Sequence, residues 1–381
     1  MTIRFVAILL ALALAPGPVA AQAPGPLRLG VSIPLTGAAA GIGQYLLWGV
    51  EIAAQEANSA GGVNGRPVEL VIEDDETDPD KARANARHLV EQERVAAVLG
   101  PANSGNALAM IPVLQQAKTP LMLLTASATP LTRPPADGSK NYVFRATLPD
   151  RDQLRKLVDW AAPRFQSIAV AADTTPYGNL CLQDITELMA EKGIKPVAVV
   201  RFDLGEQDLT PKARELARST AQAVALLTLG QEVANFVRGA DQAGYSTRFI
   251  GQYPFFLQPV KDLPERLSNG LTGVLGSSAD ASPKAREIDR LVRTRYRVEG
   301  YYPFKFVEAA YEGTRLVLEA AARAAPDDGT ALRDALESTE RFEGVSRVFL
   351  RPFSPGQHEL YKADNLSMGV WKDGAVVRLD E

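Results

Sequence analysis

The chain has 381 residues, of which 46% are hydrophobic and 23% are charged. This apolar content excludes a disordered protein, and the length exceeds what one hydrophobic core usually serves, so two domains are expected. The 41 basic and 45 acidic residues give a net charge of -4, which offers no general attraction to nucleic acid. The single cysteine, Cys181, excludes an intrachain disulfide and a cysteine-rich metal site, and we expect no bound metal.

The N-terminus has the pattern of an export signal. Arg4 supplies a positive charge, an apolar run extends from Phe5 to Ala15, and small residues follow at Val19 to Ala21. The apolar run is much shorter than the roughly 20 residues that a membrane-spanning helix needs. We therefore expect a signal peptide at residues 1–21, cleavage near Ala21 and a mature protein in the periplasm.

From Leu27 onward, short apolar runs alternate with helical patterns, which is typical of a parallel sheet covered by helices on both faces. This pattern predicts one such unit over residues 27 to about 146. Its expected strands are Leu29–Pro34, Val68–Ile72, Val95–Leu99 and Leu121–Leu124. Its expected helices are Tyr45–Ala57, a helix from Pro79 to about Glu93 that Asp78 caps, and a helix that starts after Asn103-Ser104.

The same alternation starts again after Asp150. The expected strands are Ile168–Ala172, Val197–Phe202, Ala223–Thr228, Phe249–Gly251 and Leu271–Leu275. The expected helices are Gln153–Ala161, Leu180–Lys192, Pro211–Arg218, Glu232–Ala243, Pro283–Val298 and Phe304–Ala325. The tail from Val345 is strand-like, and Tyr361–Val370 with Trp371–Arg378 predicts a closing hairpin. Two similar α/β units favour a small molecule bound between them, at the carboxyl ends of the strands.

A glycine-rich turn from Thr36 to Gly43 stands between a strand and a helix, where a dinucleotide-binding loop would stand. Tyr301 and Lys305 also have the spacing of the catalytic pair of short-chain dehydrogenases. Pro303 lies between them, however, and would break the helical turn that the pair requires. An exported protein also meets little nicotinamide cofactor. We therefore expect no cofactor and no enzymatic activity, with a dehydrogenase as the alternative.

A longer, ordered set of motifs resembles a known family. In chain order the motifs are Pro34-Leu35-Thr36-Gly37, Gly43 with Gly49, Asn58 to Gly65, Asp74-Asp75 with Asp78-Pro79, Val95 to Pro101 with Ser104, Phe144-Arg145 with Asp150 and Gln153, Asp173 with Tyr177-Gly178, and Gly244. The chain is similar to the periplasmic leucine/isoleucine/valine-type solute-binding proteins of ABC importers, the type I periplasmic binding proteins. The resemblance covers nearly the whole mature chain.

This resemblance implies an α/β fold with two doubly wound, Rossmann-like lobes that are joined by a three-crossing hinge and close over a ligand. Lobe one would comprise residues 27–146 plus 276–353, and lobe two residues 147–275 plus 354–381. The partners would be a small-molecule carboxylate or amino acid and the ABC permease subunits of the inner membrane, with no nucleic acid. We expect a monomer. A ligand-sensing receptor of the same fold is the alternative.

The resemblance also implies which residues hold the ligand. On lobe one, Ser104, Thr125 and Ser127 would bind the ligand carboxylate. The start of a helix at Ser104 suits this role, because a helix N-terminus carries partial positive charge and unsatisfied N–H donors. On lobe two, Tyr177 would close over the ligand, and Phe306 would form an apolar wall.

Tyr253 marks a departure from the family pattern. Amino-acid binders of this type usually carry an acidic residue at this position, and it pairs with the ligand ammonium. Burial of an ammonium group without a carboxylate partner costs free energy. The sequence therefore disfavours an α-amino ligand unless Asp173 or Glu232 supplies the negative charge. We expect an aromatic or other non-amino carboxylate slightly ahead of a branched-chain or other amino acid.

Overall fold

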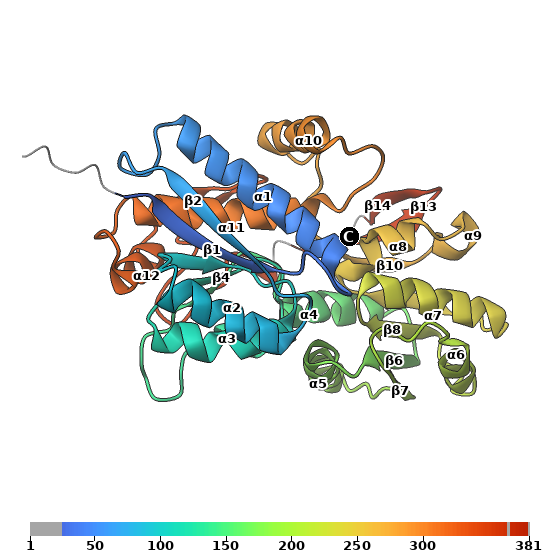
Figure 1. Ribbon diagram of the computed structural model, residues 1–381. Helices are drawn as coiled ribbons and strands as arrows, with labels where there is room; N and C mark the ends of the chain where they lie inside the picture. Colours follow the sequence, from blue (N-terminus) through green and yellow to red (C-terminus); the bar gives the residue numbers. More distant parts are fainter. Residues whose placement is uncertain (1–24, 364–365, 380–381) are drawn as a thin grey trace, which may run out of the picture.

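The computed structural model describes residues 25–363 and 366–379, so the predicted signal peptide lies outside the described residues. Two separate sheets form the centres of the two halves of the molecule (Figure 1). Among the helices of the described residues, none is both long and apolar enough to cross a lipid bilayer.

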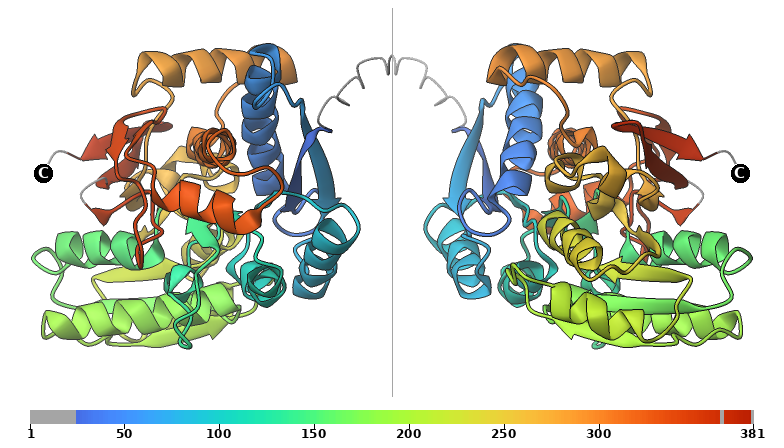
Figure 2. Two further views of the ribbon diagram at one scale, coloured as in Figure 1. Left: turned by 90° about the vertical axis from the view of Figure 1, so that its left-hand side faces the viewer. Right: turned by 90° about the vertical axis from the view of Figure 1, so that its right-hand side faces the viewer.

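The first sheet has five parallel strands in the order β2-β1-β3-β4-β5. Its strands are β1 (Leu27–Ile33), β2 (Val68–Asp74), β3 (Ala97–Leu99), β4 (Leu121–Leu123) and β5 (Val143–Arg145). One face is covered by α2 (Pro79–Glu91) and α3 (Ser104–Gln116), and the other by α1 (Ala40–Ser59) and α11 (Phe304–Ala321). The helices α10 (Pro283–Tyr296) and α12 (Gly329–Glu337) belong to the same half, with α10 beside α1 at one end of the molecule (Figure 2).

The second sheet has seven strands in the order β14-β13-β10-β9-β8-β6-β7. It is parallel from β10 to β7, and β13 and β14 are antiparallel additions at one edge. Its strands are β6 (Ile168–Asp173), β7 (Val199–Phe202), β8 (Ala223–Leu227), β9 (Arg248–Gly251), β10 (Thr272–Leu275), β13 (Ser367–Lys372) and β14 (Ala375–Leu379). The helices around it are α4 (Asp150–Ala161), α5 (Pro176–Glu191), α6 (Thr210–Ala217), α7 (Gly230–Gln242) and the short η2 (Tyr253–Phe256), α8 (Gln258–Lys261) and α9 (Glu265–Ser268).

The chain passes between the two halves three times. The first connecting segment is residues 146–149, between β5 and α4, and the second is residues 276–282, between β10 and α10. The third follows the two-stranded hairpin of β11 (Arg341–Glu343) and β12 (Val348–Leu350) and leads to β13. Each half is therefore built from segments that are far apart in the sequence.

Most of the predicted strands and helices are present within a few residues of their expected ends. Asp78 caps α2 as expected, because its carboxylate accepts a hydrogen bond from the Asp80 N–H at 2.7 Å. The closing hairpin is also present, with its turn at Asp373 and Gly374, which both have positive φ. The prediction that a strand starts at Tyr361 was wrong, because β13 begins only at Ser367. The strand β5, the hairpin β11–β12 and the helix α12 were not predicted.

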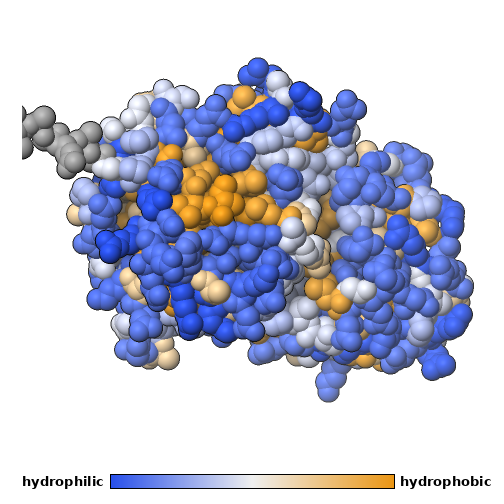
Figure 3. Space-filling model, viewed as in Figure 1, coloured by the Kyte–Doolittle hydropathy of each residue, from blue (hydrophilic) through white to orange (hydrophobic). Residues whose placement is uncertain are grey.

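The edge strand β2 leaves apolar surface uncovered. Ile72 is 40% exposed there. Figure 3 shows apolar side chains gathered over this part of the first half, at the position of β1 and β2 in Figure 1.

The helices α1 and α11 pack so closely that a glycine is required where they cross. A Cβ atom added at Gly49 would lie 2.4 Å from the carbonyl oxygen of Val307 and 2.8 Å from the Ala310 Cβ. The missing side chain therefore lets the two backbones approach, and α11 is held on the first sheet although it follows the parallel strands of the second sheet in the sequence.

We expect the substitution Gly49→Ala to lower the free energy of unfolding by about 1–3 kcal/mol, because the added methyl group overpacks this crossing. Urea denaturation followed by circular dichroism measures the change.

Gly41→Ala is the matched control on the same helix, since a Cβ at Gly41 meets no atom within 4 Å. It should leave stability unchanged or raise it by up to about 1 kcal/mol through better helix propensity. Equal stability of the two variants would contradict the close packing at Gly49.

Candidate functional site

A cavity of about 230 Å³ lies between the two halves. Its wall contains residues that follow the carboxyl ends of the nine strands β1 to β9, from Ile42 after β1 to Pro254 after β9. The helix α11 adds Lys305 and Phe306. An apolar cavity of about 150 Å³ holds a benzene molecule, so this volume suits a ligand somewhat larger than a single ring. All six residues that the sequence analysis selected lie in the wall: Ser104, Thr125, Ser127, Tyr177, Tyr253 and Phe306.

The first half contributes a polar region to this wall. Ser104 is the first residue of α3, and its Oγ accepts a hydrogen bond from the Ala128 N–H at 3.3 Å. The Thr125 hydroxyl donates to the Ala102 carbonyl at 3.2 Å. Within the described residues, no side chain caps the N-terminus of α3. Hydroxyl groups and backbone N–H groups therefore meet at one place, which is an arrangement that binds an anion without a cationic side chain.

Asp150 contributes a buried carboxyl group to the wall. Its Oδ1 accepts a hydrogen bond from Gln252 Nε2 at 2.7 Å, and its Oδ2 accepts one from the Cys181 thiol at 3.4 Å. Burial raises the pKa of Asp150 to about 6, although the hydrogen bond from Ser127 and the charge of Arg145 oppose this rise. Both carboxyl oxygens are thus already engaged with protein groups.

Tyr177 belongs to the same network. Its hydroxyl donates to Gln252 Oε1 at 3.0 Å, so Gln252 bridges Tyr177 and Asp150. Burial raises the pKa of Tyr177 well above its usual range, which keeps the phenol neutral. The hydroxyl is anchored in the second half, and the ring forms part of the cavity wall.

Two aromatic rings from different parts of the chain meet at another side of the cavity. Tyr253 lies at the start of η2, and Phe306 lies in the first turn of α11. Their ring centroids are 5.3 Å apart with an interplanar angle of 81°, an edge-to-face contact. The Tyr253 backbone N–H also donates to Gln153 Oε1 at 3.1 Å, which fixes the position of η2.

The two acidic residues proposed as alternative sources of charge do not lie in the wall. Asp173 accepts a hydrogen bond from the Thr175 N–H at 3.0 Å and thereby orders the start of α5. Glu232 accepts one from the Gly205 N–H at 3.0 Å. Neither carboxylate therefore faces this cavity in the structure. Within the described part of the chain, the acidic and basic side chains of the wall are Asp150 and Lys305.

Asp150, Gln252 and Lys305 were not predicted as site residues. Asp150 appeared in a family motif, but its contact with Gln252 joins residues 102 positions apart and has no local pattern. Lys305 was considered only as half of a dehydrogenase pair. A buried lysine in the first turn of a largely apolar helix was the signal that could have pointed to it.

The structure does not assemble the dehydrogenase arrangement. Tyr301 precedes α11, and its hydroxyl donates to the Phe256 carbonyl, whereas Lys305 Nζ donates to Glu308 at 2.8 Å. In the glycine-rich turn, the N–H groups of Leu35 and Thr36 donate to Asp74, at 2.8 Å and 3.2 Å. These N–H groups are therefore satisfied within the protein. The described residues also contain no cluster of three or more His, Cys, Asp or Glu side chains suited to a metal ion.

Comparison with known proteins agrees with this architecture. Residues 26–365 match the family described as "Periplasmic binding protein". The Leu/Ile/Val-binding protein homolog 2 of Brucella abortus is 26% identical over 321 residues, which cover 84% of each chain. The branched-chain amino acid transporter substrate-binding protein of Streptococcus pneumoniae, solved with isoleucine, has a TM-score of 0.80 at 23% identity and covers 93% of this chain and 100% of its own.

An ABC transporter solute-binding protein of Rhodopseudomonas palustris, solved with 3,4-dihydroxybenzoic acid, also has a TM-score of 0.80, at 20% identity, and covers 93% of this chain and 96% of its own. At these identities the two structures show a shared fold. The match of residues 26–365 shows the family itself. The chain belongs to the periplasmic binding protein family.

Proposed function

We propose that this protein is the exported solute-binding component of an ABC importer, and that it closes two lobes over a small carboxylate and delivers it to the membrane permease. The proposal is carried by one observation, the cavity whose wall combines the strand ends of both sheets. The lobes would be residues 27–146 plus 276–353 and residues 147–275 plus 354–381. Cleavage of the signal peptide near Ala21 would release a monomer into the periplasm.

The polar region at the start of α3 is the proposed carboxylate site. Ser104, Thr125 and Ser127 line it with hydroxyl groups, and the uncapped N-terminus of α3 supplies N–H donors and partial positive charge. The hydroxyl groups of Thr125 and Ser127 would turn from the Ala102 carbonyl and from Asp150 toward the ligand. The charge of Lys305 is paired with Glu308 at 2.8 Å, so the anion would be held by dipoles and hydroxyl groups.

The rest of the cavity favours a ligand with an apolar or aromatic body and no ammonium group. Tyr253 and Phe306 offer ring surfaces, and Tyr177 closes the wall from the second lobe. Asp150, the acidic residue of the wall, already accepts hydrogen bonds on both oxygens. A ligand ammonium would have to compete with these bonds. The fold accommodates both classes of ligand, since one similar structure holds isoleucine and another holds a dihydroxybenzoic acid.

A thermal-shift screen of the mature protein tests this proposal. Benzoate, 4-hydroxybenzoate and cinnamate are compared with leucine, isoleucine and valine, because a ligand that binds the folded state raises the melting temperature by mass action. We expect the aromatic acids to raise the melting temperature. A rise with the amino acids alone would contradict the proposed ligand class, and no rise with any of the six would contradict the carboxylate site.

The double substitution Ser104→Ala with Ser127→Ala should weaken binding of the best acid in the screen. Hydrogen bonds to a charged group contribute about 1.5–3 kcal/mol each, so a loss of roughly 2–4 kcal/mol is expected from the pair. Isothermal titration calorimetry measures it. The control is Ser338→Ala, at the C-terminal end of α12 and outside the cavity wall. The carboxylate assignment fails if the double variant binds as tightly as this control.

Tyr253→Glu should shift preference toward amino acids, because it places a carboxylate where an ammonium could pair with it. Tyr253→Gln is the matched control, since glutamine has nearly the same shape as glutamate but carries no charge. We expect isoleucine to gain affinity relative to benzoate in Tyr253→Glu and not in Tyr253→Gln, as measured by calorimetry. The same preference in both variants would show that position 253 does not face the ligand amine.

A further inference from the structure

The helix α11 carries three buried acidic or basic residues, and the first of them, Lys305, lines the cavity. Lys305, Glu308 and Glu312 are each at most 1% exposed. Burial of charged groups costs free energy unless each group is paired and hydrogen-bonded. Glu308 and Glu312 have no part in the proposed ligand contacts, so their retention in the core calls for another role.

Partners for these charges come from α11 itself and from other segments of the chain. Lys305 Nζ donates to Glu308 Oε2 at 2.8 Å and lies 3.5 Å from the centre of the Tyr361 ring. The hydroxyl groups of Ser277 and Ser346 also donate to Glu308.

Glu312 is satisfied in a similar way. It accepts hydrogen bonds from the Tyr361 hydroxyl and from the Val345 N–H, both at 2.7 Å. Lys305, Glu308, Glu312 and Tyr361 therefore form one connected group, which we call the α11 cluster.

The α11 cluster contacts the second and third connecting segments, and the first lies close by. Ser277 lies in the second segment, and Tyr361 lies in the third. A Cβ added at Gly276 would lie 2.8 Å from Lys305 Cδ and 3.4 Å from Leu148 Cδ1, so the first segment packs here through Leu148. Lys305 also lines the ligand cavity. The cavity and the segments about which the lobes would move thus share one set of side chains.

The ionisation of Glu312 in this cluster depends on its burial away from water. Burial, together with the charge of Glu308, raises the pKa of Glu312 to about 7, while Lys305, the Tyr361 hydroxyl and the Val345 N–H oppose the rise. From the β11–β12 turn, the Arg347 guanidinium adds a positive charge 5.9 Å from the Tyr361 ring centre. A glutamate in water ordinarily titrates near 4.3. If the connecting segments moved away from α11, water would reach Glu312 and its pKa would fall toward that value.

The direction of the pH effect follows from this difference. Between pH values of about 4.3 and 7, the compact arrangement binds more protons than an arrangement with Glu312 in water. Its relative stability is therefore greatest below that range and decreases as the pH rises through it. Protons favour the arrangement in which the connecting segments cover the cluster.

We propose that the α11 cluster makes closure of the two lobes proton-linked: the closed form takes up a proton on Glu312, and the open form releases it. This inference rests on the proposed function, because it requires that the lobes move about the connecting segments. It adds a regulation of ligand capture, in which a rise in pH favours opening and release.

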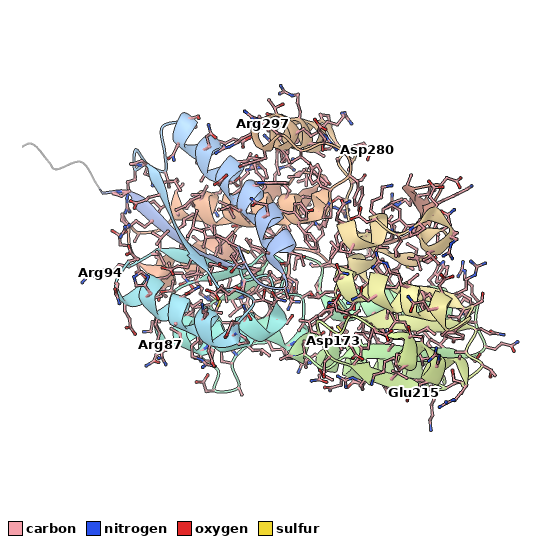
Figure 4. All side chains as sticks on the ribbon, turned by 45° about the vertical axis from the view of Figure 1, so that its right-hand side comes forward. Arg87, Arg94, Asp173, Glu215, Asp280 and Arg297 are labelled. Atoms are coloured by element: carbon pink, nitrogen blue, oxygen red, sulfur yellow. The ribbon has the colours of Figure 1, made fainter. Side chains whose placement is uncertain are left out.

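Single-molecule fluorescence energy transfer on the ligand-free mature protein tests the inference. Dyes are attached at Arg87→Cys on α2 and Glu215→Cys on α6, two exposed positions on opposite halves of the molecule (Figure 4). The native Cys181 is fully buried and does not compete for the label. We expect the population to move from the shorter to the longer distance between pH 5.5 and pH 8.5.

Two variants assign the effect to the cluster. Glu312→Gln cannot ionise and should lose the response to pH. It keeps Asp150, whose pKa of about 6 falls in the same range, so the loss would assign the proton to Glu312. Tyr361→Phe keeps the ring against Lys305 but removes a hydrogen bond that favours the ionised form. It should move the midpoint upward by about one pH unit.

Glu319→Gln is the matched control. It removes a partly exposed carboxylate from the same helix, paired with Arg315 outside the cluster, and should respond to pH as the unmodified sequence does. A distance distribution that is equal at both pH values would overturn the inference. A full response in Glu312→Gln would do the same, as would an unmoved or lowered midpoint in Tyr361→Phe.

The same labelled protein separates this inference from the proposed function. Addition of the acids from the screen at constant pH reports closure by ligand. Closure by ligand without any response to pH overturns the proton linkage alone. A response to pH in a protein that binds none of the acids overturns the proposed ligand and leaves the linkage in place.

Discussion

The contact between α1 and α11 is the constraint on which the rest of the structure depends. It brings a helix that follows the parallel strands of the second sheet in sequence back onto the first sheet, and the Tyr311 hydroxyl reaches Glu56, 255 residues away, at the same interface. The absence of a side chain at Gly49 makes this approach possible. Because α11 is placed there, Phe306 and Lys305 reach the cavity, and the buried glutamates of α11 meet the connecting segments.

Much of the fold could be predicted from sequence because its parallel strands are continuous apolar runs between amphipathic helices. The signal fails where elements are short or depend on distant partners. The strands β5, β11 and β12 have three residues each, too few to show a period. The equally short β3 and β4 could be predicted because they lie in longer apolar runs, Val95–Leu99 and Leu121–Leu124. The segment around Tyr361 looks strand-like because its aromatic and apolar residues are buried, yet Tyr361 contacts Lys305 and Glu312 in place of a sheet neighbour.

The candidate site likewise contains residues that could be predicted from sequence and contacts that could not. The six predicted residues converge because each lies near the end of a strand or the start of a helix, and parallel strands place such positions at one edge. Their roles in ligand binding remain predictions. The engagement of Asp150 by Gln252 and Cys181 could not be predicted, since it depends on which side chains meet after folding. That engagement turns an apparent source of negative charge into a part of the scaffold.

Because each half is formed from segments far apart in the sequence, the newly synthesised chain cannot fold one half at a time. The second sheet is extended by β13 and β14, which are the last strands made, and β10 pairs directly with β13. In the first half, both faces of the sheet are covered only after α11 has been synthesised. Neither hydrophobic core can therefore be completed while the ribosome is still synthesising the C-terminal third of the protein. A chain with this topology stays incompletely folded until its synthesis is nearly finished, which suits the proposed export through a membrane before folding.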